Sequence, residues 1–110
     1  MHRINKRDLP FLGSSWSFVG DEQGGAPLCA YLIEAPRGKG PVLHTHPYDT
    51  VAFVQSGKAV WTIDGQDVDA GPGDIVIVEA GSKHRFVSTG DEPLVAIDVH
   101  PSGRFEQTNL

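Results

Sequence analysis

The chain has 110 residues, 39% of them hydrophobic, and nine lysines and arginines against fourteen aspartates and glutamates give a formal net charge of −5. This length suits one domain, the apolar content excludes a disordered chain, and an acidic domain without a basic cluster is a poor partner for nucleic acid. No apolar run approaches the ~18 residues that cross a bilayer, and no apolar stretch follows the basic N-terminus, so we expect neither a membrane partner nor a secretory signal.

Short apolar runs separated by turn residues, among them thirteen glycines and eight prolines, indicate an all-β domain. After a polar arm at 1–12, we expect nine strands at 16–19, 28–35, 42–46, 50–55, 59–63, 66–70, 74–78, 84–87 and 94–100. Strands about 8–12 residues apart are typical of a sandwich or small barrel. We therefore expect a single domain over 1–110, with its core at 28–100 and a C-terminal tail at 101–110.

Two segments of this pattern allow more specific predictions, one for a hairpin and one for a buried strand. Asp64 and Gly65, between the runs at 59–63 and 66–70, form the strongest hairpin signal of the chain. The run at 74–78 reads Asp-Ile-Val-Ile-Val and shows no polar alternation over its apolar part. We expect this strand to be covered on both faces.

Two of the five histidines, His44 and His46, are separated by a single residue. On a strand, residues i and i+2 point to the same face, so the two imidazoles can chelate a divalent transition metal such as Zn, Fe, Ni, Mn or Cu. Two partly exposed loop histidines would give the same spacing. The pair alone therefore leaves both interpretations open.

The residues around this pair resemble the first motif of the cupin superfamily, G(X)5HXH(X)3–4E(X)6G. Here the motif begins at Gly38, continues through His44 and His46, and ends at Gly57, with Thr50 at the glutamate position. The register of the glycines and histidines agrees throughout. Only the carboxylate is missing.

The second cupin motif, G(X)5PXG(X)2H(X)3N, matches from Gly73 through Gly81 and His84 to Ser88, with Glu79 at the proline position. The two motifs and their spacer span 38–88. The resemblance implies a small single-domain cupin, a jelly-roll β-barrel (double-stranded β-helix) with a metal in its mouth. It also implies a ligand set of His44, His46 and His84, plus a carboxylate.

The missing carboxylate has two structural interpretations. If the strand from 44 to 54 is unbroken, Thr50 lies on the face of the histidines and Asp49 points away; a bulge after Pro47 would bring Asp49 back. Without Asp49 the site has three neutral histidines, leaves a +2 ion with open positions, and favours anionic bidentate ligands. In its ligand set, such a site resembles the three-histidine iron sites of cysteine dioxygenase and the acetylacetone-cleaving dioxygenase. The loss of the carboxylate also fits a metal-free binding module.

We refer to His44, His46 and His84 as the histidine triad. Three residues outside it are candidates for a catalytic role. Tyr48 can donate a hydrogen bond to substrate or be a structural rim residue, and Thr50 occupies the glutamate position. His100 shares a strand face with Asp98, and the pair would orient a ligand histidine or shuttle a proton if that face lines the barrel. The alternative for His100 is a surface histidine at a strand end.

We therefore predict one divalent transition metal per chain, iron first, in an enzyme with a dioxygenase-like reaction on a small anionic or enolisable substrate. The alternatives are a redox-silent metal-dependent isomerase, cyclase or lyase, and a non-catalytic binder of small ligands. The single cysteine, Cys29, cannot form an internal disulfide and favours a cytoplasmic location. The apolar arm at 9–12 and Phe105 in the tail suggest a homodimer.

Overall fold

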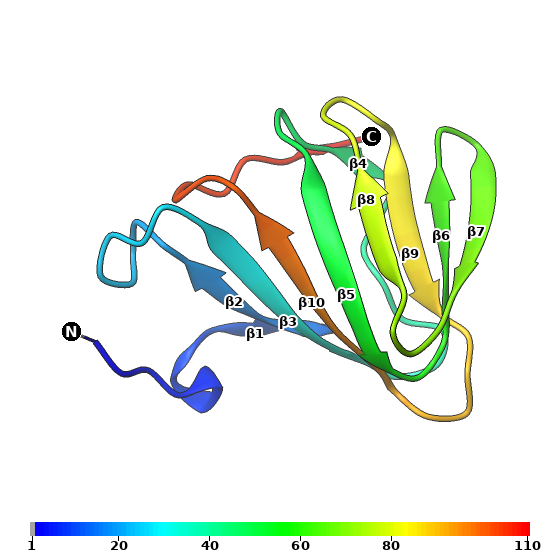
Figure 1. Ribbon diagram of the computed structural model, residues 1–110, viewed down its shortest axis with the longest axis horizontal. Coiled ribbons are helices and arrows are strands. Elements are labelled where there is room, and N and C mark those ends of the chain that lie inside the picture. The colour runs from blue at the N-terminus through cyan, green and yellow to red at the C-terminus, as the bar shows by residue number, and fades with distance from the viewer. Residues whose placement is uncertain (1) are drawn as a thin grey trace.

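Two antiparallel β-sheets face each other in the computed structural model, which describes residues 2–110 (Figure 1). One sheet has six strands in the order β1-β2-β3-β10-β5-β8, and the other has five in the order β11-β4-β9-β6-β7. The strands are β1 (Phe11–Leu12), β2 (Ser15–Val19), β3 (Cys29–Ala35), β4 (His44–Thr45), β5 (Thr50–Ser56), β6 (Ala59–Ile63), β7 (Gln66–Ala70), β8 (Ile75–Val78), β9 (His84–Ser88), β10 (Leu94–His100) and β11 (Thr108–Asn109). The all-β jelly roll predicted from the sequence is confirmed.

The core lies between the sheets because successive side chains of a strand point to opposite faces. On β5, Ala52 and Val54 are buried, whereas Phe53 between them is exposed. From the opposite sheet, the Trp61 ring stacks on Phe86 with ring centroids 5.1 Å apart. These two aromatic residues pack in the core and also line the cavity described below.

The spacing of the motif glycines follows from the turns of this fold. Gly38, Gly57, Gly73 and Gly81 all have positive φ, between 77° and 88°, a region that side chains with a Cβ rarely adopt. A Cβ at Gly57 would in addition collide with the carbonyl oxygen of Pro93. The glycine pattern therefore reports the turns that bring the histidine-bearing segments together.

The expectation that 74–78 is covered on both faces is wrong. Val76 and Val78 are buried, but Ile75 and Ile77 are exposed. The strand β8 is an edge of the six-stranded sheet, so its inner face packs on the core and nothing within residues 2–110 covers its outer face. An apolar run without alternation indicated burial, but it did not distinguish an edge strand from a central one.

The strands predicted at 42–46 and 50–55 are separate in the structure, so the condition of an unbroken strand from 44 to 54 is not met. β4 belongs to the five-stranded sheet and β5 to the six-stranded one, so the chain crosses between the sheets at 46–49. The inward alternation nevertheless persists through this crossing: His44, His46 and Thr50 are all buried. Both sheets face the same interior, so every second side chain still points inward after the chain has crossed from one sheet to the other.

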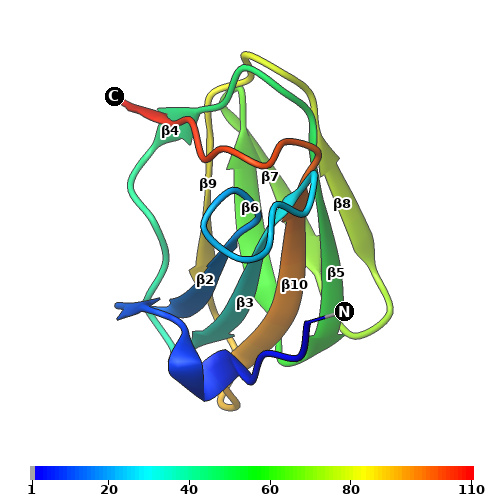
Figure 2. The same cartoon turned by 90° about the vertical axis from the view of Figure 1, so that its left-hand side faces the viewer.

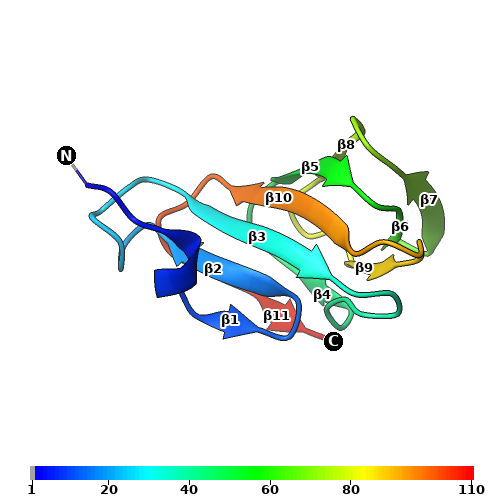
Figure 3. The ribbon, with the colours of Figure 1, turned by 90° about the horizontal axis from the view of Figure 1, so that it is seen from below.

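Both terminal segments contain more structure than we expected. The arm at 1–12 holds a short 3-10 helix, η1 (Lys6–Asp8), and the edge strand β1, while Met1 lies outside the described residues. The C-terminal tail leaves β10, crosses the open end of the barrel and pairs through β11 with β4 (Figures 2 and 3). Within residues 2–110, no helix has the length and apolar character needed to cross a membrane.

Candidate metal centre

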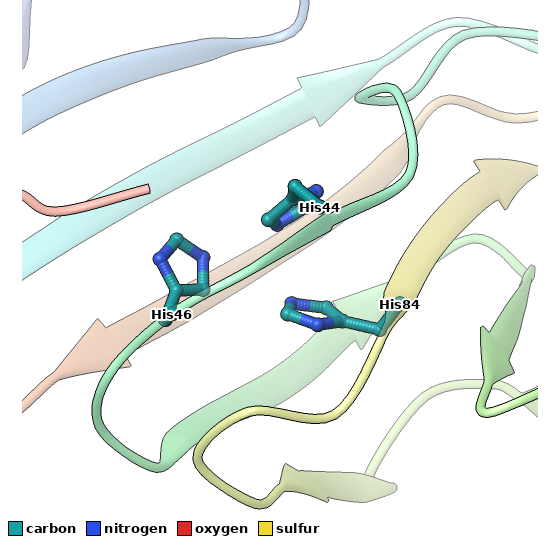
Figure 4. Close-up of side chains that lie close together, drawn as sticks. All are labelled: His44, His46 and His84. Atoms are coloured by element: carbon teal, nitrogen blue, oxygen red, sulfur yellow. The ribbon is translucent and has the colours of Figure 1, made fainter. Parts of the chain in front are cut away.

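Three histidines from two segments meet inside the mouth of the barrel (Figure 4). His44 lies on β4, His46 follows it, and His84 begins β9, where it pairs with His44 in register. One ring nitrogen of each lies within 4.8 Å of the others, and each residue is only 4% exposed. The structure thus brings together the three residues that the motif singled out.

Hydrogen bonds to the backbone define which ring nitrogen of each histidine is free. In all three, Nδ1 contacts a backbone carbonyl oxygen, which can only accept, so Nδ1 carries the proton and Nε2 keeps its lone pair. Such contacts orient the ring and set the tautomer for binding a metal through Nε2. The carbonyls are those of Val42 for His44 at 2.6 Å, Glu106 for His46 at 2.7 Å, and Ser82 for His84 at 2.9 Å.

Burial favours the neutral form of two of these imidazoles, His44 and His46. It lowers the pKa of His44, and it lowers the pKa of His46 to about 4; neighbouring histidines add to both effects. The hydrogen bond from His46 to Glu106 opposes the shift without cancelling it. The lone pairs are therefore available near neutral pH, as a metal ligand requires.

No carboxylate joins the three histidines within the described part of the chain. Thr50, at the motif's glutamate position, is 2% exposed and lines the same cavity. Asp49 is exposed and accepts a hydrogen bond from the backbone N–H of Ala80 at 2.8 Å. A bulge that turns Asp49 toward the histidines is therefore absent from this segment, and Thr50 holds the inward position as predicted.

The histidines open into a cavity of about 520 Å³ between the sheets. This volume falls in the range of small-molecule sites. Most of its wall is apolar, and polar side chains besides the histidine triad also line it. The apolar wall includes Ile33, Ala52, Trp61, Val76, Val78 and Phe86; the polar groups include Glu22, Tyr31, Lys39, Thr50, Asp98 and His100.

The other catalytic candidates form a second polar group beside the triad. His100 is 2% exposed and faces the cavity, so the alternative of a surface histidine is wrong. Its ring meets His46 nearly edge-on, with centroids 4.5 Å apart, and its Nδ1 lies 3.0 Å from the Tyr48 hydroxyl. Asp98, two residues earlier on β10, places a carboxylate oxygen 3.6 Å from His100 Nε2.

The contribution of the C-terminal tail had no signal in the sequence. The Glu106 carbonyl accepts from His46, and the Glu106 N–H donates to the Tyr48 hydroxyl at 3.1 Å. Phe105 packs near Tyr31, with ring centroids 5.3 Å apart. A backbone carbonyl is present at every residue, so no residue type could mark this one in advance.

Comparison with curated proteins relates this chain to two kinds of enzyme. The acireductone dioxygenase of Bacillus thuringiensis subsp. konkukian (strain 97-27) is 34% identical over 61 residues, which are 51% of this chain and 36% of the relative. The dimethylsulfoniopropionate lyase DddQ of Ruegeria pomeroyi (strain ATCC 700808 / DSM 15171 / DSS-3) is 30% identical over 87 residues, 78% of this chain and 40% of the relative. The chain thus spans well under half the length of either protein.

Solved structures and the family model agree on the architecture. The formate complex of Lactobacillus farciminis oxalate decarboxylase superposes with a TM-score of 0.86 at 19% identity, over 97% of this chain and 35% of that one. Bacillus subtilis oxalate decarboxylase, studied for its Mn(II) centres, gives 0.79 at 23% identity, over 92% and 29%. At 19% and 23% identity, these likenesses show only that the fold is shared. The family model of the cupin domain matches residues 31–100, well over half of the sequence, and the chain therefore belongs to the cupin family.

Proposed function

We propose that this chain binds one divalent transition metal through His44, His46 and His84 and acts as a mononuclear metalloenzyme on a small anionic or enolisable substrate. The observation that carries the proposal is the convergence of three buried imidazoles, each with Nδ1 held by a backbone carbonyl. Histidines that merely packed in a core would not need to bring a ring nitrogen of each within 4.8 Å of the others.

The donor set suits a metal that accepts imidazole ligands: iron as the first assignment, or zinc, nickel, manganese or copper. When bound, such an ion supplies a Lewis-acidic centre and, in the case of iron, a means of activating O2. The three histidines carry no charge, and Thr50 adds none, so an anionic substrate would meet an uncompensated positive centre. The apolar wall around it strengthens that attraction by excluding water.

A dioxygenase-type reaction is the first assignment, and the likeness to acireductone dioxygenase supports it over 51% of the chain. The second candidate is a redox-silent lyase or isomerase. The likeness to dimethylsulfoniopropionate lyase covers 78% of the chain, and Asp98 offers a carboxylate that can accept a proton at the wall of the cavity. A non-catalytic binder of small ligands is the remaining alternative.

The first test is metal content. Protein prepared without an affinity tag and reconstituted with Fe(II), or separately with Zn(II), should hold about one ion per chain by elemental analysis. His84→Ala should lose most of the metal, whereas His2→Ala, which removes an exposed histidine in the N-terminal arm, should retain it. Wild-type protein with far less than one ion after reconstitution contradicts metal binding.

The second test separates the reaction classes. Oxygen uptake by the iron form, but not the zinc form, in the presence of enediols or 1,3-diketones supports the dioxygenase. Turnover by the zinc form under anaerobic conditions supports the lyase or isomerase. Tight ligand binding without turnover by either form points to the binding module.

A further inference from the structure

A second site in the same cavity holds a donor and an acceptor without partners. Among residues 2–110, Asp98 Oδ1 and His100 Nε2 are buried and make no hydrogen bond. His100 Nε2 lies 3.6 Å from the other carboxylate oxygen, Asp98 Oδ2, too far for a hydrogen bond. Buried polar atoms without partners are costly, and both residues line the cavity.

The surrounding contacts decide which nitrogen of His100 carries the proton. The Tyr48 hydroxyl oxygen accepts from the Glu106 N–H, and its single hydrogen can go to His100 Nδ1 at 3.0 Å or to the Glu106 carbonyl at 3.3 Å. Donation to His100 Nδ1 is the shorter contact and leaves the proton on Nε2. The opposite tautomer would turn a lone pair toward the Asp98 carboxylate, which is unfavourable. His100 therefore presents an N–H beside an Asp98 oxygen.

We propose that Asp98 and His100 form a subsite for a hydroxyl group of the substrate. The hydroxyl oxygen accepts from His100 Nε2–H, and its hydrogen is donated to Asp98 Oδ1. Other small groups fit less well. A carboxylate would face the Asp98 charge, an ammonium cannot accept from Nε2–H, and a methyl group would leave both atoms unsatisfied.

The position of the subsite sets the substrate class, an inference that rests on the proposed function for the anionic end. His100 packs against His46, and Asp98 lies opposite Tyr31 on β3 and Ala52 on β5. The subsite thus shares one cavity with the histidine triad and lies to one side of it. A short hydroxylated carboxylate, with its anion at the triad and its hydroxyl at Asp98, satisfies both ends.

Matched ligand pairs test the subsite in zinc-loaded protein, where no redox chemistry intervenes. Calorimetry would compare acetate with glycolate, propionate with 3-hydroxypropionate, and butyrate with 4-hydroxybutyrate. At least one hydroxy acid should bind about 10-fold or more tightly than its partner. In Asp98→Ala this preference, taken as the ratio of the two affinities in the same variant, should fall below about 2-fold, so that an effect of the lost charge on both acids cancels. Asp69→Ala, which removes an exposed carboxylate on β7, should behave as wild type.

A second arm does not depend on the metal. Ethanol titrated into the metal-free protein should shift the imidazole NMR signals of His100, acetonitrile should not, and Asp98→Ala should abolish the ethanol response. The zinc content, measured alongside calorimetry, tests metal binding by the histidine triad. It does not depend on the hydroxyl subsite, so failure of the two proposals can be distinguished. Absence of any hydroxyl preference in wild type, an equal preference in Asp98→Ala, or an unresponsive His100 would each overturn the subsite.

Discussion

Deleting residues 105–110 should weaken metal binding through a single ligand, His46. This segment supplies the Glu106 carbonyl that accepts from His46 Nδ1 at 2.7 Å. The corresponding carbonyls for His44 and His84 come from Val42 and Ser82, which the deletion leaves in place. The perturbation therefore removes one of three orienting contacts and none of the ligands themselves.

The expected loss is about 10-fold in metal affinity, or about 1.4 kcal/mol. Loss of a group that orients a metal-binding histidine costs about 10–100-fold. We place this case at the lower end because the deletion also opens the site to water, which can replace the lost carbonyl as an acceptor. The remaining cost is orientational, since the His46 ring then samples both tautomers and more than one rotamer.

Competition of the zinc-loaded protein with a chelator of known affinity measures the loss. Two matched variants separate its causes. Deleting only 108–110 removes β11 but keeps the Glu106 carbonyl, and Glu106→Ala removes the ion pair with Arg104 but also keeps it. Both should lose less than about 3-fold in affinity.

Equal losses in the two truncations would refute this reasoning, because β11 pairing with β4 would then be what holds the site. An unchanged affinity in the longer deletion would equally refute it. Thermal unfolding of each variant, together with Phe105→Ala, distinguishes a local effect on His46 from general loss of the fold.

Three further predictions address single residues. Thr50→Glu should tighten zinc binding by about 10-fold or more because it adds a charged ligand, and Thr50→Val should leave it unchanged; chelator competition checks both. The lowered pKa of His46, about 4, means that the unfolded chain takes up this proton before the folded one does. The free energy of unfolding of the metal-free protein should therefore fall by about 3 kcal/mol between pH 6.5 and 4 because of His46. Urea unfolding at both pH values should show this loss in wild type and not in His46→Gln. The homodimer stays a prediction: analytical ultracentrifugation should give twice the mass of the chain, and Leu12→Lys, on the exposed arm, should halve it.

The metal triad was predictable because its signal lies in residue types and spacing. His44, His46 and His84 are the natural ligands at those positions, and the glycines around them mark turns with positive φ that few other residues tolerate. The inward position of Thr50 was predicted for an incomplete reason. The strand is broken at 46–49, but alternation continues because both sheets share one interior.

The sequence could not predict features that depend on tertiary context. The outer face of β8 is exposed because that strand lies at an edge, and an apolar run is compatible with edge and centre alike. The tail contributes through the Glu106 backbone, which no residue type signals. The inward direction of His100 was one of two open alternatives. Which face of β10 lines the barrel is decided by its pairing with β3 and β5, and that pairing is not visible in the sequence of β10 itself.

The charge distribution of the cavity argues for one orientation of substrate. In many metal sites a carboxylate ligand partly neutralises the ion, but here the acidic residues that line the cavity, Asp98 and Glu22, lie outside the histidine triad. A bound metal would thus keep its full positive charge at one place while Asp98 keeps a negative charge at another. An anionic group turned toward Asp98 would meet repulsion, and a hydroxyl turned toward the metal would leave Asp98 Oδ1 without a partner. Separating the carboxylate from the ligands therefore gives the cavity a stronger direction than a four-ligand site would have, because a carboxylate ligand would neutralise part of the metal's charge.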